Sequence, residues 1–192
     1  MIHLHTIGDS HADTGTWSAI DIPGLEIITH SLSPMTCASF GFGVVDISSF
    51  NISENDWVVY CFGEIDCRDN IGKHKNYKEI IDKIVEDYLY TVSKYKFAKV
   101  FIFSVPPAVI QATAAGDPWP CTGTDEERKE YVRYMNERLK SGCESYGFDF
   151  FDVHDKYTDE NGYFDLKYRD NCVHIADPVF LKEYLYDKVQ EG

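Results

Sequence analysis

The sequence has few basic residues for its length. Its 18 Lys and Arg stand against 32 Asp and Glu, which gives a formal net charge of −14. Nucleic acids and anionic membrane surfaces are bound through basic patches, so this shortage argues against both kinds of partner. The sequence also lacks an apolar run long enough to span a bilayer, and no basic segment with a cleavage site precedes the first apolar run. We therefore expect neither a membrane anchor nor a secretory signal.

Paired cysteines are missing as well. No Cys-x-x-Cys pair and no spacing typical of zinc ligands occurs among Cys37, Cys61, Cys67, Cys121, Cys143 and Cys172. Reduced thiols in a cytoplasmic protein are the favoured interpretation, and one or two disulfides are the alternative. No bound metal is expected.

The overall composition is that of a folded protein. Hydrophobic residues make up 44% and aromatic residues 15% of the 192 residues. This composition and length suit one globular domain over residues 1–192 rather than two domains. No internal repeat, low-complexity segment or linker divides the chain.

Five apolar runs alternate with helical patterns along the chain. The runs are rich in Val, Ile, Phe and Tyr and mostly lack strict alternation, which favours strands of a parallel sheet buried on both faces. They cover residues 2–7, 25–32, 57–62, 99–105 and 148–153.

Apolar residues at helical spacing predict one helix over about residues 76–94 and a second through residues 131–146. Thr124 and Glu127 form a capping-box pattern for the second helix. A last helix is expected to begin near Asp177 and Pro178, an N-cap followed by proline at the first helical position. Alternating strands and helices predict a three-layer α/β/α sandwich.

Open α/β sheets place their sites at the carboxyl ends of the strands. Ser10, Ser33, residues 63–68 and the segment before the last helix converge at that edge. The long connection over residues 108–123 also starts there. It is either a lid or wall for a substrate or an irregular insertion, with equal support, and it contains Asp117, Pro118, Trp119 and Pro120.

Ser10 is the candidate nucleophile, because Gly8, Asp9 and Ser10 directly follow the first strand. A nucleophilic serine needs a histidine base, a group that orients this base, and donors for the oxyanion. His174 is the best candidate base, since it lies just before the last helix. Asp170, four residues earlier, can reach the far imidazole nitrogen.

The other six histidines fit the role of base less well. His11 is adjacent to Ser10, so its ring reaches the hydroxyl only awkwardly, and His154 after the fifth strand is a weaker alternative. His30 either lines the site or packs in the sheet. The remaining three are interpreted as packed or exposed residues rather than metal ligands, namely His3, His5 and His74.

Three motifs, in this order along the chain, resemble those of the SGNH (GDSL-type) hydrolases over nearly the full length. They are Gly8-Asp9-Ser10, the Gly-Glu-Ile-Asp block at residues 63–66, and an Asp–His pair before the C-terminal helix. The resemblance implies a flavodoxin-like α/β/α fold and no metal or cofactor. It also implies that Ser10 is the nucleophile and first oxyanion donor, and that His174 is the base. Members of this family are mainly esterases, lipases, carbohydrate deacetylases and some acyltransferases.

Two positions depart from the family pattern in the oxyanion hole. Ser33 stands where the family has a glycine that donates its N–H, and Ile65 stands where it has an asparagine. Ile65 has no donor, and one lost donor typically costs about 10²- to 10³-fold in rate. Arg68 or another N–H, with Gly63 as a candidate, would then complete the hole. The Gly-Glu-Ile-Asp block itself resembles that of a subgroup of the family.

The acidic residue that orients the base is also displaced from the family pattern. Asn171 occupies its usual position, and Asp170 lies one residue further from His174. Either residue is a candidate for orienting the base. Further side chains expected to line the site are Asp9, His11, His30, Glu64, Ile65, Asp66 and Asn171.

The favoured hypothesis is a serine-dependent ester hydrolase that removes or transfers an acyl group on a carbohydrate or another small polar molecule. The alternative is a non-catalytic domain of the same fold that binds a glycan or a protein partner, which Ile65 favours. A phosphate- or nucleotide-binding module is disfavoured, because the sequence has no Gly-x-Gly-x-x-Gly, no P-loop and an acidic balance. The oligomeric state does not follow from the sequence.

Overall fold

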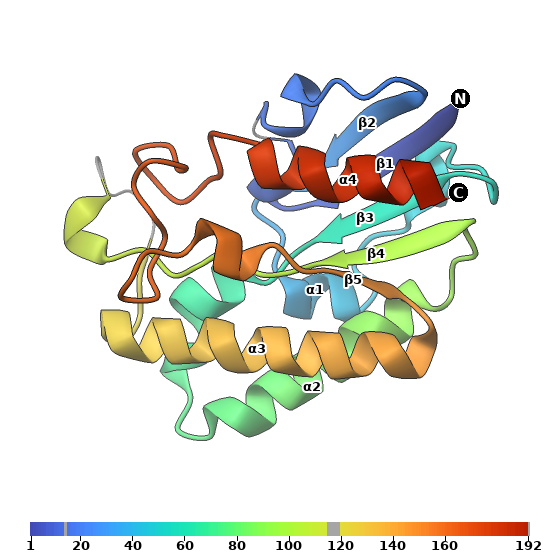
Figure 1. Cartoon of the computed structure of the whole chain (residues 1–192). Coiled ribbons are helices and arrows are strands. Elements are labelled where there is room, and N and C mark those ends of the chain that lie inside the picture. Colours follow the sequence, from blue (N-terminus) through green and yellow to red (C-terminus); the bar gives the residue numbers. More distant parts are fainter. Residues whose placement is uncertain (14, 115–119, 192) are drawn as a thin grey trace.

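Five parallel strands form the centre of the computed structural model, which describes residues 1–13, 15–114 and 120–191 (Figure 1). The strands lie in the order β2-β1-β3-β4-β5, which is the flavodoxin-like order. Their bounds are β1 Ile2–Gly8, β2 Leu25–Ser31, β3 Trp57–Cys61, β4 Lys99–Phe103 and β5 Asp149–Phe151. The predicted five-stranded parallel sheet is thus confirmed.

Helices cover both faces of this sheet, which confirms the three-layer sandwich. Figure 1 shows α1 (Cys37–Gly41), α2 (Tyr77–Val92) and α3 (Asp125–Tyr146) on one face and α4 (Val179–Glu191) on the other. Two separate hydrophobic cores result, one on each face of the sheet.

Strand β3 shows why the predicted strands lack a polar face. Val58 and Tyr60 pack in the core beneath α1, α2 and α3, whereas Trp57 and Val59 pack in the core beneath α4. All four side chains are buried. A strand covered on both faces gains stability from apolar residues at every position, so its sequence reads as a continuous apolar run.

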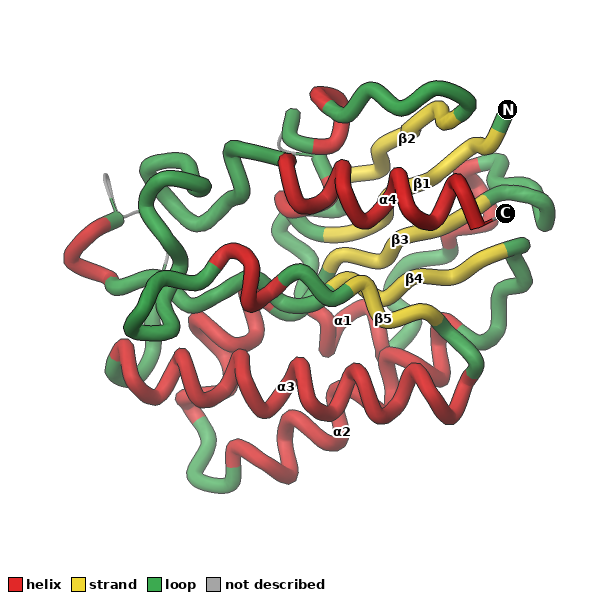
Figure 2. Tube along the Cα trace, viewed as in Figure 1, coloured by secondary structure: helices red, strands yellow, loops and turns green. Residues whose placement is uncertain are grey.

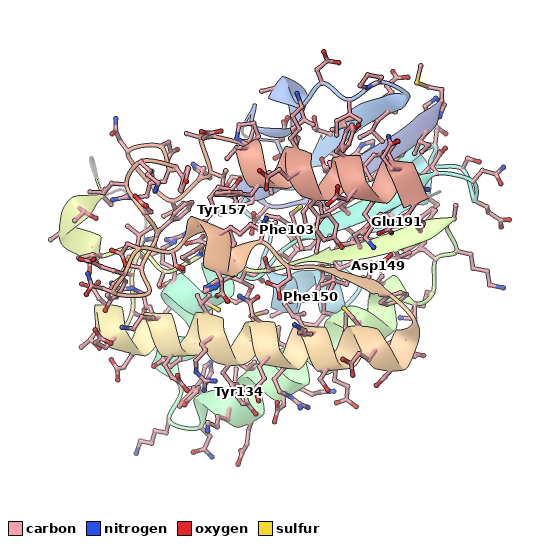
Figure 3. The ribbon with its side chains drawn as sticks, viewed as in Figure 1. Phe103, Tyr134, Asp149, Phe150, Tyr157 and Glu191 are labelled. Carbon is pink, nitrogen blue, oxygen red and sulfur yellow. The ribbon has the colours of Figure 1, made fainter. Side chains whose placement is uncertain are left out.

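The helix signals are also confirmed. Thr124 and Glu127 form the capping box of α3, and Asp177 accepts the N–H of Val179 at 3.0 Å at the start of α4. Tyr134 projects from α3 toward α2, where its hydroxyl donates to Asp82 at 3.0 Å (Figure 3). The short α1 was not predicted, because five residues form a single turn with no apolar periodicity to detect.

Strand β5 is shorter than predicted. It pairs only with β4, and only residues 149–151 take part, so Phe148 and Val153 lie outside the strand.

The strands all end at the same side of the molecule, where the loops gather (Figure 2). The connection after β4 lies here, but Asp117, Pro118 and Trp119 fall outside the described residues. No disulfide joins the six cysteines, all of which lie among the described residues. Among the described helices, none combines the length and apolar character needed to cross a membrane.

Candidate active site

Ser10 lies directly beyond the end of the central strand β1. Gly8 ends that strand, and a Cβ at this position would lie 2.0 Å from the carbonyl oxygen of Cys61 on β3, so only glycine fits. Asp9 then accepts the backbone N–H of His11 and caps the 3-10 turn Ser10–Ala12. This turn presents the Ser10 hydroxyl at the carboxyl edge of the sheet.

The structure brings Ser10, His174 and Asp170 into one chain of hydrogen bonds. The Oγ of Ser10 lies 2.9 Å from Nε2 of His174, and Nδ1 of His174 lies 2.7 Å from Oδ2 of Asp170. Ser10 and His174 are 164 residues apart in sequence. The arrangement is that of a nucleophile, a base and a group that orients the base.

Asp170 also shapes the turn that carries His174. Its Oδ1 accepts the backbone N–H of Cys172 at 2.7 Å and that of His174 at 3.1 Å. Burial disfavours the carboxylate, but the hydrogen bonds from His174 and Cys172 outweigh it and lower the pKa of Asp170 below its ordinary value. Asn171 is exposed, so Asp170 rather than Asn171 contacts the imidazole.

An open cavity, which we call the catalytic cavity, contains the Ser10 hydroxyl and the His174 imidazole. Its lining residues are Ser10, Ser33, Pro34, Ile65, Arg68, Asp69, Pro120, Val173 and His174. Sequence reasoning missed Pro34, Asp69, Pro120 and Val173. Pro34, Asp69 and Val173 adjoin Ser33, Arg68 and His174 in sequence, and Pro120 belongs to the connection over residues 108–123 that was a candidate wall for a substrate.

Two backbone N–H groups at this cavity are candidate oxyanion donors. Ser10 and Ser33 both line it, and in the part of the chain that the structure describes neither N–H donates a hydrogen bond to another residue. Ile65 lines the same cavity and contributes only carbon atoms. The Ser10 and Ser33 amides thus fit the sequence prediction for this hole.

Arg68 lines the cavity, but two of its nitrogens are already engaged. Its Nε donates to Glu64 at 2.7 Å and its Nη1 to the carbonyl of Pro120 at 2.9 Å. Gly63 begins this turn with φ of 115°, and a Cβ there would lie 2.7 Å from Cγ2 of Val105. Gly63 therefore shapes the turn, and an oxyanion role for Arg68 or Gly63 stays a prediction.

Several other expected site residues lie outside the catalytic cavity. His30 stacks on His5 and Phe50 and lies 2.9 Å from the His5 ring, so the expectation that it lines the site is wrong. The strand register explains this, because His5 pairs with Ile28, and His30 two residues further on lies on the same face of the sheet as His5. Asp9 and His11 are buried behind the cavity.

Three further candidates have defined places. Asp66 is fully buried and faces the start of α1. Glu64 lines a neighbouring, mostly apolar cavity, which shares Arg68 and Val173 with the catalytic one. His154, the weaker candidate base, pairs with Asp155 at 2.9 Å and does not line the catalytic cavity.

Neither the family models nor the curated proteins contain a match to this sequence. Solved structures do match. A GDSL-like lipase from Bacteroides thetaiotaomicron is 15% identical with a TM-score of 0.68, over 98% of this chain and 88% of that one. A catalytic mutant of an acetylxylan esterase from Geobacillus stearothermophilus is 14% identical with a TM-score of 0.62, over 98% and 94% of the two chains.

A third match is the aryl esterase of M. smegmatis, which is 14% identical with a TM-score of 0.61, over 100% of this chain and 99% of that one. These likenesses cover the whole sheet and its helices at low sequence identity. The flavodoxin-like strand order and the matches together show that this chain has the fold of the SGNH (GDSL-type) hydrolases.

Proposed function

We propose that the protein is a serine-dependent ester hydrolase. The observation that carries this proposal is the hydrogen-bonded chain from Ser10 through His174 to Asp170, with the hydroxyl open to a cavity. The esterase and lipase activities named for proteins of the same fold are consistent with it.

The first half of the reaction forms an acyl-enzyme. Ser10 Oγ attacks the ester carbonyl while Nε2 of His174 takes the hydroxyl proton, and the carboxylate of Asp170 stabilises the imidazolium that results. The amides of Ser10 and Ser33 hold the oxyanion. The tetrahedral intermediate then collapses, and His174 returns the proton to the leaving alcohol.

The second half transfers the acyl group to water. His174 removes a proton from the water as its oxygen attacks the acyl carbonyl, and Ser10 leaves with that proton. An acceptor alcohol in place of water would give acyl transfer through the same residues.

The walls of the catalytic cavity support a proposal for the substrate class. Ser33, Arg68 and Asp69 place polar groups beside the nucleophile, and they suit a substrate with hydroxyl groups. An acetyl or other short acyl group on a carbohydrate, or on another small polar molecule, is therefore the proposed substrate.

A non-catalytic binding domain is the second candidate, and the observation that favours it is Ile65 in the cavity wall. Hydrolysis of p-nitrophenyl acetate by the wild type and by Ser10→Ala distinguishes the two. Turnover that disappears in the variant supports the hydrolase. Equal rates for both proteins, at background level, would favour the binding domain.

A further inference from the structure

His11 connects the turn that carries the nucleophile with the turn that carries the base. Its ring is buried behind the cavity, with Nδ1 2.9 Å from Oδ1 of Asp9 and Nε2 3.2 Å from the carbonyl oxygen of Val173. Val173 immediately precedes His174. The ring centroids of His11 and His174 are 5.1 Å apart.

Both partners of the His11 ring can only accept hydrogen bonds. A carboxylate oxygen and a peptide carbonyl oxygen carry no hydrogen, whereas a neutral imidazole has a single N–H. The two contacts are satisfied together only when both ring nitrogens carry hydrogen. His11 is therefore an imidazolium paired with the carboxylate of Asp9.

The electrostatic surroundings agree with this assignment. Burial disfavours the charged ring, but the charge and hydrogen bond of Asp9, the charge of Glu64 and the Val173 carbonyl outweigh it and raise the pKa of His11 to about 9. The ring thus stays charged at neutral pH.

The hydrogen bonds within the turn of residues 170–174, which carries His174, do not fix the distance of this turn from Ser10. Within that turn, the carboxylate of Asp170 accepts the backbone N–H groups of Cys172 and His174. Besides the Ser10–His174 hydrogen bond, two contacts of described residues cross from the segment after β1, that of His11 with the Val173 carbonyl and that of the Thr16 hydroxyl with the Ile175 carbonyl. The His11 contact is the one adjacent to the base.

We propose that His11 is a positioning residue, which acts through the carbonyl of Val173 to hold His174 within hydrogen-bonding distance of Ser10. This inference rests on the proposed function. His11 touches neither the nucleophile nor the substrate, and the family motif alone does not supply such a group, because the ring comes from the residue after Gly8-Asp9-Ser10.

Deprotonation of His11 would undo this contact in a defined way. The neutral ring keeps its hydrogen on Nδ1, where the carboxylate of Asp9 is the stronger acceptor, so the lone pair of Nε2 faces the Val173 oxygen. The resulting repulsion displaces the base. Misplacement of a reacting group by about 1 Å can cost about 10²-fold in rate.

The charged and titratable groups that face His11 come from three elements. They are Asp9 in its own turn, Glu64 in the turn after β3, and His174 in the turn before α4, which is itself paired with Asp170. A small pocket beside the ring is lined by side chains without charge, namely those of Thr16, Trp17, Phe103, Ile175 and Leu181.

The test measures p-nitrophenyl acetate hydrolysis from about pH 6 to about pH 10 for the wild type, His11→Gln and His11→Leu, with Ser10→Ala rates subtracted. We expect the wild-type kcat to fall reversibly above pH 9 or so, with KM nearly constant. His11→Leu should lose about ten- to a hundredfold in kcat across the whole range. The kcat of His11→Gln should be higher than that of His11→Leu, because the amide can donate to the Val173 carbonyl. It should not fall at high pH, because the amide does not titrate.

The controls separate this inference from the proposed function. No Ser10-dependent turnover in the wild type would contradict the hydrolase itself. Ser10-dependent turnover with His11→Leu within about threefold of the wild-type kcat would overturn the role of His11, as would an unchanged alkaline fall in His11→Gln. If thermal melting shows that His11→Leu is unfolded, the pH profile of His11→Gln decides. His154→Gln removes a histidine that does not line the cavity and should leave the profile unchanged.

Discussion

The buried carboxylate of Asp66 accepts the backbone N–H of Cys37 at 2.6 Å. A second N–H, from Ala38, reaches the same carboxylate at 3.2 Å. Asp66 follows β3, whereas Cys37 begins α1, just after Ser33 and Pro34 of the catalytic cavity. One carboxylate therefore fixes the two loops that form one wall of the site.

This arrangement predicts a pH-dependent contribution to folding stability. Burial, opposed by the two N–H donors, raises the pKa of Asp66 to about 7. The folded state thus holds the proton more tightly than the unfolded state. The contribution is fully present below about pH 4 and is lost as the pH rises through about 7, at about 1.4 kcal/mol per pH unit between these limits.

Urea unfolding at several pH values measures this effect. The free energy of unfolding of Asp66→Asn should lack the decline that the wild type shows between about pH 4 and pH 7, because the amide does not titrate there. Parallel pH profiles for the two proteins would show that Asp66 does not titrate in this range.

Ser10→Ala and His174→Ala should lose activity to a similar depth, on the order of 10⁴-fold or more, because triad members act as a unit. The double variant should be no worse than either single variant. Steady-state hydrolysis of p-nitrophenyl acetate is the measurement. Near-normal turnover in His174→Ala would overturn the assignment of His174 as the base.

Asp170→Asn should reduce kcat by about 10⁴-fold, because an amide no longer fixes the tautomer of His174 or stabilises its charged form. Asn171→Ala is the matched control, since Asn171 is exposed and Asp170 makes the contact with the imidazole. A larger loss in Asn171→Ala than in Asp170→Asn would reverse the assignment.

Ile65→Asn should raise kcat, by about tenfold or more, if an amide at this position reaches the oxyanion. Ile65 lines the catalytic cavity, so a donor placed there faces the substrate. Ile65→Leu controls for the change of shape. A kcat no higher than that of the Leu variant would show that the Ser10 and Ser33 amides already suffice.

Gly63→Ala should destabilise the fold by about 2–4 kcal/mol, since it combines positive φ with a Cβ too close to Val105. Gly147→Ala also introduces a side chain at positive φ, here 72° in the left-handed helical region, but its Cβ would meet no atom within 4 Å. It should cost only about 1–2 kcal/mol. Thermal or urea unfolding compares the two variants, and equal losses would remove the steric argument.

Much of the fold could be predicted from the sequence, because its signals are local. The apolar runs predict strands such as Trp57–Cys61, and Thr124 with Glu127 predicts the start of α3. The single-turn helix Cys37–Gly41 has only the N-cap Thr36 as a local signal, and its first N–H groups bind Asp66, a residue distant in sequence.

The residues of the site also divide into those with a local sequence signal and those whose place depends on distant contacts. Ser10, His174 and Asp170 could be proposed because each lies beside a strand or helix end with a recognisable local pattern. The place of His30 could not, because β2 alone does not reveal that its ring stacks between His5 and Phe50. The pairing of His11 with Val173 likewise joins residues 162 apart in sequence.

Ser10 lies at the end of β1 inside the sheet, whereas His174 stands on the turn that leads into α4, which packs on the opposite face of the sheet from α1, α2 and α3. Leu181 and Leu185 pack α4 on the core of that face. The proposed hydrolysis therefore depends on the packing of α4, because that packing holds the base beside the nucleophile. Leu185→Ala, which leaves a cavity beneath α4, should reduce Ser10-dependent hydrolysis while circular dichroism still shows a folded protein.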